Sequence, residues 1–441
     1  MTTAARPFPF ASLTTWSLAA LVAGLLVGMV GHASESSGIA ALAEALKPLG
    51  NLWVAALQMI VLPLVITHML AAIAGVRGNE SVGGLGGRAV LLFVVLLGIG
   101  ALFTLALAPP IISRYTVNPA TIASLQAATP VPDAVRQAAL ARPESFGDWI
   151  AGLVPSNLFE AALRGDILAL LLFTVLFALA VRRVPQEYRD PLTTVFQGLA
   201  AAMLICVRWM LWFTPVGVFV FSLLLGVTTG GAGAGMLGAF VVIVSGLMLL
   251  FTLLLYPVSA VLGRTSMGVF ARAVAPAQLI AVSTRSSIAA LPALVEGGRD
   301  CLRLPESATG FVLPLSVSLF KVNRTISSTV KLLFIARLYG VPLSAAALAT
   351  FILTVILMSF SNAGVPGGGS AFKTLPAYLA AGVPIEGVVI VEVVDMIPDI
   401  FKTLLNVTGD MSVATLLSRS SRPARGAVQA SDRSPAATGA S

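Results

Sequence analysis

The chain has few of the residues that build disulfide frameworks, metal clusters and many active sites. In 441 residues it has two cysteines and two histidines. Cys206 lies within an apolar run and Cys301 in a loop, so neither a disulfide framework nor a cysteine-rich metal site is expected. The sequence also has no nucleophile–base pair, metal-ligand set or cofactor motif. We therefore expect no enzymatic activity and no cofactor.

Charge is equally scarce, and apolar residues take its place. Only 10% of the residues are charged, 57% are hydrophobic, and the mean hydropathy is +0.95. Soluble globular proteins do not have this composition. Several apolar runs exceed the roughly 20 residues that cross a bilayer. The runs cover about 15–35, 51–75, 89–113, 150–181, 198–227, 235–262, 304–336, 346–360 and 383–417. The sequence thus predicts a polytopic membrane protein whose core is set by lipid.

The net charge of +8 does not indicate a nucleic-acid partner. The basic residues lie mostly in short loops and tails, where the positive-inside rule explains them and places both termini in the cytoplasm. Residues 419–441 are rich in Ser, Arg, Ala and Gly and predict a disordered cytoplasmic tail. Residues 114–148 predict an external loop with a short helix over 133–140; the sequence assigns this loop no role.

Two apolar segments in the second half are interrupted where a simple spanning helix would continue. Residues 283–292 read STRSSIAALP, and residues 361–370 read SNAGVPGGGS. Non-helical backbone at membrane depth is tolerated only where protein buries it or it lines a cavity. Two such interruptions, each between half-length apolar arms, predict re-entrant hairpins whose tips meet. Paired interruptions of this kind indicate the binding site of a secondary transporter.

Ionisable residues form a stripe along the last apolar run. Asp395, Asp399, Lys402, Asn406 and Asp410 follow one another at steps of three or four residues. At 3.6 residues per turn this spacing predicts one face of a single helix. A charge facing lipid at mid-bilayer costs about 2.5 to 3.5 kcal/mol. The stripe therefore predicts an intramembrane binding site.

At these three places the chain resembles the dicarboxylate/amino acid:cation symporters, the family of the glutamate transporters. Further resemblance lies in LQMIVLPLVITHML (57–70), in the segment 154–181 and in LWFTPVGVFVF (211–221). The implied fold is all-α and integral to the membrane, with eight transmembrane helices plus two re-entrant helical hairpins related as inverted repeats. A homotrimer is also implied, in which a mobile transport domain slides against a trimerisation scaffold.

The resemblance also divides the chain into parts. Residues 1–265 would hold mainly the scaffold helices 1, 2, 4 and 5, with transport-domain helices 3 and 6 interspersed. Residues 266–418 would form the transport core: hairpin 1, helix 7, hairpin 2 and helix 8. The location implied is the bacterial inner membrane.

The implied function is secondary active symport of a small anionic or zwitterionic solute, a dicarboxylate or an amino acid, by alternating access. The alternative is a diverged family member that acts as an exchanger, an anion-conducting pore or a substrate sensor without coupled transport. Measured flux separates the two.

In the first hairpin, exposed N–H groups and hydroxyls at a helical tip favour an anion. The family resemblance assigns Ser286 and Ser287 to a substrate carboxylate; the following position, commonly Ser in the family, is Ile288 here. The alternative is that the two serines only close a tight turn. Arg285 is expected to pair with Asp399 or Asp395, because an unpaired arginine at that depth is costly.

In the second hairpin the resemblance makes Val365 and Gly369 part of a lid over the substrate. In the last helix it assigns Asp399 to a substrate amino group, Asn406 to the α-carboxylate, and Thr403 to neighbouring polar contacts. Lys402 stands where relatives for acidic substrates carry Arg, and lysine lacks the planar fork of arginine. Two interpretations stay open: Lys402 contacts the substrate, or it pairs internally with Asp399.

Helix 7 departs from the family pattern. The family has an unwound Asn-Met-Asp-Gly-Thr segment that coordinates sodium, and this chain has Phe320 to Thr325 there, without the aspartate. We expect Lys321 or Arg324 to act as a fixed cation that neutralises Asp410 or Asp399, with sodium-independent, proton-linked transport. The alternative is that both side chains reach an aqueous edge and coupling is lost. The coupling ion is thus proton or sodium; if sodium is retained, Asn406 and Asp410 would bind it.

Overall fold

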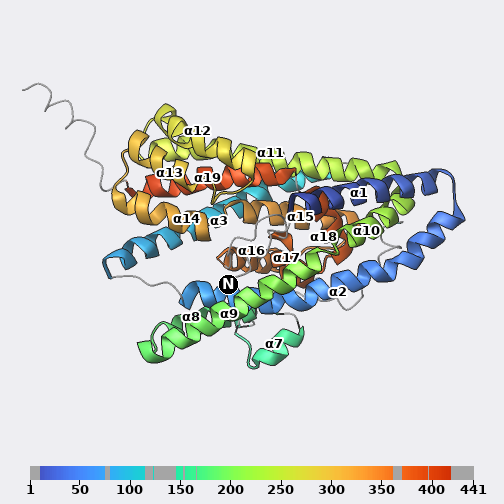
Figure 1. Ribbon diagram of the computed structural model, residues 1–441, viewed down its shortest axis with the longest axis horizontal. Coiled ribbons are helices and arrows are strands. Elements are labelled where there is room, and N and C mark those ends of the chain that lie inside the picture. The colour runs from blue at the N-terminus through green and yellow to red at the C-terminus, as the bar shows by residue number, and fades with distance from the viewer. Residues whose placement is uncertain are drawn as a thin grey trace, which may run out of the picture.

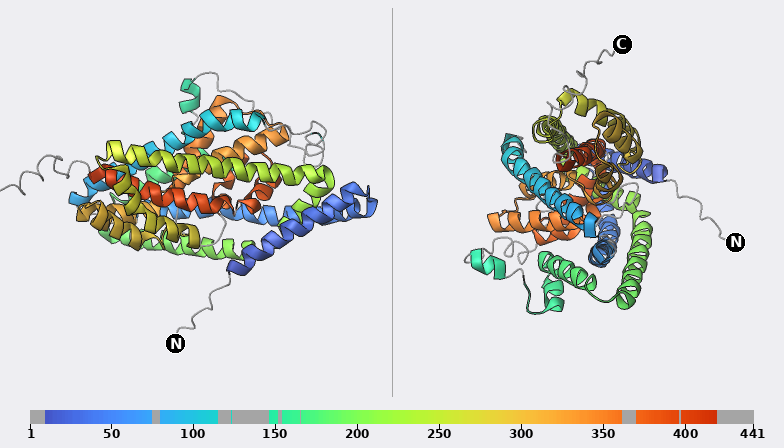
Figure 2. Two further views of the ribbon diagram at one scale, coloured as in Figure 1. Left: turned by 90° about the horizontal axis from the view of Figure 1, so that it is seen from above. Right: turned by 90° about the vertical axis from the view of Figure 1, so that its left-hand side faces the viewer.

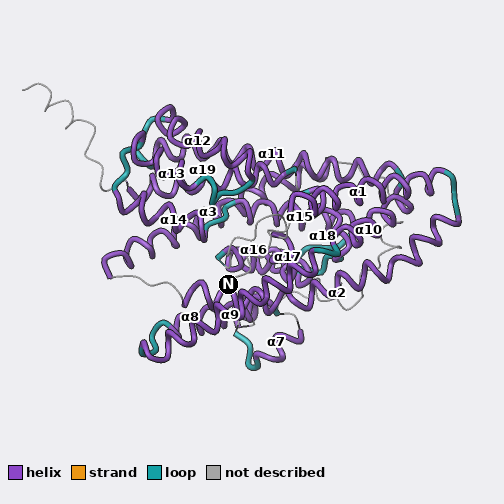
Figure 3. The backbone as a smooth tube through the Cα atoms, viewed as in Figure 1, coloured by secondary structure: helices purple, strands orange, loops and turns teal. Residues whose placement is uncertain are grey.

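The fold was obtained as a computed structural model. It describes residues 10–74, 80–114, 123, 146–151, 154–164, 166–360, 370–395 and 397–418. Within these ranges every regular element is helical and no strand occurs (Figure 3). The all-α class predicted from the sequence is therefore confirmed for the described part of the chain.

The first half of the chain forms nine described helices, most of them long. They are α1 (Phe10–Ala33), α2 (Ser37–Ala74), α3 (Glu80–Arg114), α6 (Phe146–Ala151), α7 (Leu158–Arg164), α8 (Ile167–Val181), α9 (Gln186–Leu211), α10 (Thr214–Thr229) and α11 (Gly231–Leu262). Shorter pieces make up the second half. They are α12 (Met267–Thr284), α13 (Leu291–Glu296), the π-helical turns η1 (Gly297–Cys301) and η2 (Ala308–Val312), α14 (Leu313–Leu319), α15 (Asn323–Tyr339), α16 (Ala345–Ser359), α17 (Ser370–Ala380), α18 (Ile385–Val394) and α19 (Pro398–Leu417).

The helices have the length and composition of membrane spans. Within the described residues, five helices are long and apolar enough to cross a bilayer. They cover Thr15–Ala33, Gly84–Arg114, Gln186–Met210, Gly231–Leu262 and Met267–Thr284. Shorter apolar helices cover Leu62–Ala71, Ile167–Val181, Thr214–Thr229 and Ala345–Ser359. Together with the outward-facing leucines and valines of these helices, this indicates an integral membrane protein.

The helices pack in two groups (Figures 1 and 2). In one, α10 contacts α1 and α2, and α2 also contacts α8 and α9. In the other, α11, α12 and α14 pack around α19, and α3 lies along α15. The helices α16, α17 and α18 lie between the two groups (Figure 1). The polar stripe of α19 is therefore enclosed by protein.

Close contact of α1 with α10 depends on small residues. A Cβ built on Gly28 would lie 2.5 Å from the carbonyl oxygen of Leu223 and 2.8 Å from the Cα of Gly226. A Cβ on Gly24 would lie 2.2 Å from Oγ of Ser222. Lipid provides little hydrophobic drive for helix association, so membrane helices pack through small residues that let backbones approach.

The first interruption forms a helical hairpin. Arg285 ends α12 in the left-handed region, with φ of 53°. The chain then turns, and α13 and η1 pack back against α12. The second interruption falls between α16 and α17, which also contact one another. Its tip, with Val365 and Gly369, lies outside the described residues.

The ionisable stripe from Asp395 to Asp410 does not lie on a single helix, although its spacing predicted that it would. Asp395 follows the last residue of α18, and α19 begins only at Pro398. A proline lacks an N–H and restricts the preceding residue, so it fits the first turn of a helix and not its interior. Asp399 to Asp410 thus share α19, whereas Asp395 reaches the site from α18.

Candidate functional site

The run predicted over 304–336 is broken between α14 and α15. Phe320 is extended, with φ of −94° and ψ of 121°, and α15 starts again at Asn323. The ring of Phe320 stacks on Phe93 of α3, with centroids 4.6 Å apart. A Cβ on Gly409 would lie 3.1 Å from Cγ1 of Val322, so α19 passes directly against the break. The break therefore opens toward the stripe of α19.

Lys321 lies inside this break. Its Nζ donates to Oγ of Ser287 at 2.7 Å and to the carbonyl oxygen of Val317 at 2.6 Å. Ser287 is a buried residue of the first hairpin tip. A lysine ammonium thus joins the tip of the hairpin to the last turn of α14.

The two serines of the tip have different partners. Oγ of Ser286 accepts a hydrogen bond from the backbone N–H of Ala289 at 3.3 Å, which closes the turn. Oγ of Ser287 accepts from Lys321 instead. Ser286 therefore acts as a turn residue, which was one of the two interpretations. Ser287 instead binds the buried ammonium of Lys321.

Asn406 connects α19 to the start of α15. The backbone N–H of Asn323 donates to Oδ1 of Asn406 at 3.3 Å, and Nδ2 of Asn323 donates to the carbonyl oxygen of Lys402 at 3.3 Å. The first N–H groups of a helix have no partner within the helix, and Asn406 satisfies one of them. Nδ2 of Asn406 makes no hydrogen bond with the described residues and can donate to a ligand.

Asp410 lies one turn further along α19 and is completely buried. Neither of its carboxylate oxygens has a hydrogen-bond partner among the described residues. Its electrostatic interaction is with Lys321. Burial of a carboxylate is costly without a compensating cation. Of the two cations and two carboxylates that the sequence proposed as pairs, Lys321 and Asp410 interact electrostatically, although they form no direct ion pair.

Arg324 has a different environment. It is buried in the first turn of α15, and its favourable electrostatic interaction is with Glu392. Asp410 and Asp399 receive no such interaction from it.

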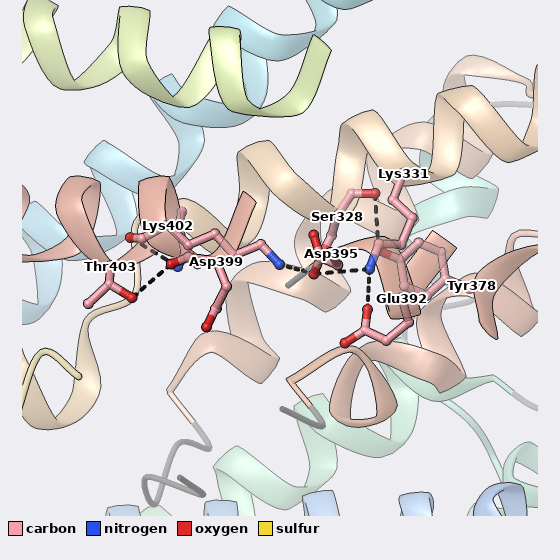
Figure 4. Close-up of polar contacts among 9 residues, drawn as sticks. Ser328, Lys331, Tyr378, Glu392, Asp395, Asp399, Lys402 and Thr403 are labelled. Atoms are coloured by element: carbon pink, nitrogen blue, oxygen red, sulfur yellow. Dashed lines mark hydrogen bonds and ion pairs between the residues drawn. The ribbon is translucent and has the colours of Figure 1, made fainter. Parts of the chain in front are cut away.

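Four buried charges lie beyond the break, on three helices (Figure 4). Lys331 of α15 pairs with Glu392 of α18, and its Nζ lies 3.6 Å from Oδ2 of Asp395. Lys402 of α19 pairs with the same Oδ2 of Asp395. The side chains of these four residues are between 2% and 12% exposed. We call Lys331, Glu392, Asp395 and Lys402 the charge cluster.

The ion pairs within the charge cluster differ from two pairings that were expected from the sequence. Lys402 has Asp395 as its ion-pair partner, seven residues away, and not Asp399. Asp395 is held by two lysines and not by Arg285, which is exposed and forms no ion pair with any residue that the structure describes. In both cases the packing of α15 and α19 beside the end of α18 places two lysines on Asp395.

Asp399 stays outside the charge cluster. Its carbonyl oxygen accepts from Oγ1 of Thr403 at 2.9 Å (Figure 4), but its half-buried carboxylate forms no hydrogen bond or ion pair with described residues. Lys402 and, more weakly, Arg285 interact with it electrostatically. Among the described residues, the carboxylate of Asp399 is therefore available to receive a cationic group.

Lys331 and Glu392 were not among the residues selected from the sequence. A signal was present, because each is an ionisable residue within an apolar stretch, Lys331 in VKLLFIA and Glu392 in VVIVEVV. Ionisable residues within membrane segments are rare and face partners inside the protein. Selecting all such residues would have found both.

Comparison with known proteins places this chain in a family. The model of the sodium:dicarboxylate symporter family matches residues 13–420. The chain is 29% identical over 409 residues to the proton/glutamate-aspartate symporter of Escherichia coli (strain K12), covering 92% of each chain. It is 29% identical to the proton/sodium-glutamate symport protein of Bacillus subtilis (strain 168), covering 92% of each chain. It is also 29% identical to the C4-dicarboxylate transport protein of Rhizobium johnstonii, covering 93% of this chain and 89% of the relative. This chain belongs to the sodium:dicarboxylate symporter family.

Proposed function

We propose that the chain is a secondary symporter of small carboxylated solutes, dicarboxylates or amino acids, that works by alternating access. The observation that carries the proposal is the convergence of the first hairpin tip, the break between α14 and α15, and the stripe of α19 on one buried polar site. Relatives named as glutamate, aspartate and C4-dicarboxylate symporters support the same solute chemistry. Membership of a transporter family favours transport over enzymatic activity.

The proposed architecture has eight transmembrane helices and two re-entrant hairpins. In it α12 with α13 and η1 forms hairpin 1, α16 with α17 forms hairpin 2, and α14 with α15 forms the broken helix 7. The separate packing of α1, α2, α8, α9 and α10 supports a scaffold distinct from the transport core of residues 266–418. We further propose a homotrimer in the bacterial inner membrane, with both termini in the cytoplasm.

The solute would lie between the first hairpin tip and α19. Nδ2 of Asn406 and the tip at Ser286 and Ser287 would bind its α-carboxylate, because amide and hydroxyl donors stabilise an anion. The free carboxylate of Asp399 would bind an amino group, with Thr403 beside it. Val365 and Gly369 would belong to the lid.

A sodium ion does not fit the break in helix 7. A hard cation requires oxygen ligands and net negative charge, whereas the ammonium of Lys321 already occupies the hydrogen-bonding positions offered by Ser287 and Val317. Asp410, the carboxylate that would attract sodium, already interacts electrostatically with this ammonium. We therefore propose that Lys321 is the resident countercharge of Asp410 and that transport does not require sodium, with a proton as the coupling ion.

Uptake into proteoliposomes tests the proposal. Purified protein should accumulate a radiolabelled solute under an inward proton gradient, to the same extent in sodium and in choline buffer. A strict sodium requirement would contradict the proposed role of Lys321 without contradicting transport. Exchange without accumulation, or ion current without solute flux, would favour a diverged exchanger or pore. Binding without any flux would favour a sensor.

A further inference from the structure

The ammonium of Lys321 has one more N–H group than its protein partners use. A lysine ammonium carries three donors. One goes to Oγ of Ser287 at 2.7 Å and one to the carbonyl oxygen of Val317 at 2.6 Å, and the third makes no hydrogen bond with a residue that the structure describes. Lys321 is also half-buried, whereas Asp410 is completely buried. The side chain of Lys321 is therefore accessible to a ligand, and that of Asp410 is not.

The contact with Lys321 determines how Ser287 can bind a ligand. A serine hydroxyl has one hydrogen to donate and two lone pairs that accept, whereas an ammonium only donates. Oγ of Ser287 is therefore the acceptor in this contact, and its own O–H is not donated to any residue within the described ranges. Hydrogen bonds in a chain polarise one another, so a hydroxyl that accepts from a cation becomes a stronger donor. Lys321 thus leaves Ser287 ready to donate to an anion.

Asn406 adds a third donor from α19. The backbone N–H of Asn323, two residues after Lys321, donates to Oδ1 of Asn406, which leaves Nδ2 of that amide for a ligand. The hairpin tip, the break and α19 thus each contribute one donor: a hydroxyl, an ammonium and an amide. A carboxylate accepts several hydrogen bonds on its two oxygens, and those from charged donors are about twice as strong as those from neutral donors. The three donors therefore match a carboxylate.

The charges around Lys321 do not remove its ammonium from this position. Asp410 attracts the ammonium and Arg324 repels it. The attraction to Asp410 acts without a direct ion pair, because neither carboxylate oxygen of Asp410 has a hydrogen-bond partner in the described part of the chain. The ammonium is instead bonded to Ser287 and Val317. It can therefore act on Asp410 through space and bind a ligand with its remaining N–H.

We propose that Lys321 binds a carboxylate of the solute directly, together with the hydroxyl of Ser287 that it orients. This inference rests on the proposed transport function and adds a solute-binding residue to the same site. The carboxylate lies between Nζ of Lys321, Oγ of Ser287 and Nδ2 of Asn406. A solute that has an amide in place of this carboxylate gives the ammonium no charged partner, so the site discriminates against it.

Pairs of solutes that differ in one carboxylate test the proposal in the full-length protein. The pairs are alanine and alaninamide, glutamate and isoglutamine, aspartate and isoasparagine, and succinate and succinamate. Thermal shift in detergent identifies the pair that binds, and calorimetric titration gives the ratio of the two affinities. In the wild type the acid should bind at least tenfold more tightly than the amide. A ratio near one would overturn the proposal. Binding with the expected ratio but without uptake into proteoliposomes would contradict the transport function and leave the role of Lys321 standing.

Lys321→Met should lower the ratio of acid to amide affinity at least tenfold, because only the acid loses a charged partner. The substitution also leaves Asp410 without its cation, and that charge would weaken an acid even without direct contact. The double variant Lys321→Met/Asp410→Asn removes both charges and separates the two causes. A ratio that stays low in the double variant supports direct binding. A ratio that returns to the wild-type value would show that Lys321 only neutralises Asp410, and would overturn the proposal.

Arg337→Gln is the matched control, because it removes a cation from the exposed end of α15. It should keep the wild-type ratio of acid to amide affinity. If Lys321→Met does not fold, the double variant gives the same comparison, since neither residue of the pair is then charged.

Discussion

Nζ of Lys321 lies 2.7 Å from Oγ of Ser287, so a cation in the break of helix 7 is bonded directly to the tip of the first hairpin. The same ammonium is the electrostatic partner of Asp410, whose oxygens have no hydrogen bond among the described residues. We propose that this side chain takes the place of a free cation, so that the charge of Asp410 is balanced before any ion arrives.

Replacing Lys321 by methionine tests whether its ammonium neutralises Asp410. Asp410 would become an uncompensated buried carboxylate, so uptake should fall at least tenfold and a cation from solution should be attracted. We expect sodium to raise the apparent melting temperature of Lys321→Met but not of the wild type, because a ligand that binds only the native state stabilises it.

Lys321→Arg keeps the charge and serves as the control for that measurement. It should show no stabilisation by sodium. Equal sodium stabilisation in the wild type and in Lys321→Met would mean that the ammonium does not substitute for an ion.

Lys331→Met should strongly destabilise the protein, by about 3 to 5 kcal/mol, because it removes the ammonium that pairs with both Glu392 and Asp395 in a buried environment. Adding Glu392→Gln should recover part of this loss, since Asp395 keeps its ion pair with Lys402. Chemical unfolding of the four members of this double-mutant cycle in detergent measures the coupling energy. Additive effects of the two substitutions would show that Lys331 and Glu392 do not interact.

Gly409→Ala tests the passage of α19 against the break. The new Cβ would lie 3.1 Å from Cγ1 of Val322 and 3.3 Å from Cε1 of Phe320, closer than most real contacts. Such overpacking costs about 1 to 3 kcal/mol, and it should lower the melting temperature. Gly246→Ala in α11 is the control, because no atom lies within 4 Å of its Cβ. That variant should be neutral or slightly stabilising, by at most about 1 kcal/mol, since alanine favours a helix.

Gly28→Leu should separate α1 from α10. The side chain would have to occupy space held by the backbone of Leu223 and Gly226, so the two helices cannot keep their present distance. We expect lower thermal stability and faster limited proteolysis of α1. Gly198→Leu in α9, where no atom lies within 4 Å of the Cβ, should change neither measurement.

Several features of the site were predictable from the sequence because they are local. The hairpin at 283–292 followed from hydroxylated residues and a proline inside an apolar run, and α12 does end there at Thr284. Lys321 was selected as an internal cation because it lies in the segment where the family pattern has an aspartate and no cation. The helical class followed from apolar runs long enough to cross a bilayer.

Side-chain partners were harder to predict, because they depend on contacts between helices. Spacing along a helix suggested Asp399 as the partner of Lys402, since residues three or four apart are neighbours on one face. That argument assumed a helix continuing through Asp395, whereas α18 ends at Val394 and α19 begins at Pro398. Proline at the start of α19 contained the signal for this boundary.

The sequence by itself determined the class of this protein: an all-helical membrane protein of a symporter family, with an interrupted second half and with two cations in the segment that lacks the family aspartate. Composition, run length and motif are properties of the chain alone, so no fold was required to read them. Only the tertiary structure decided which charges meet. It brought Lys331, Asp395 and Lys402 together from three helices, because ion pairing over such separations depends on how α15, α18 and α19 pack.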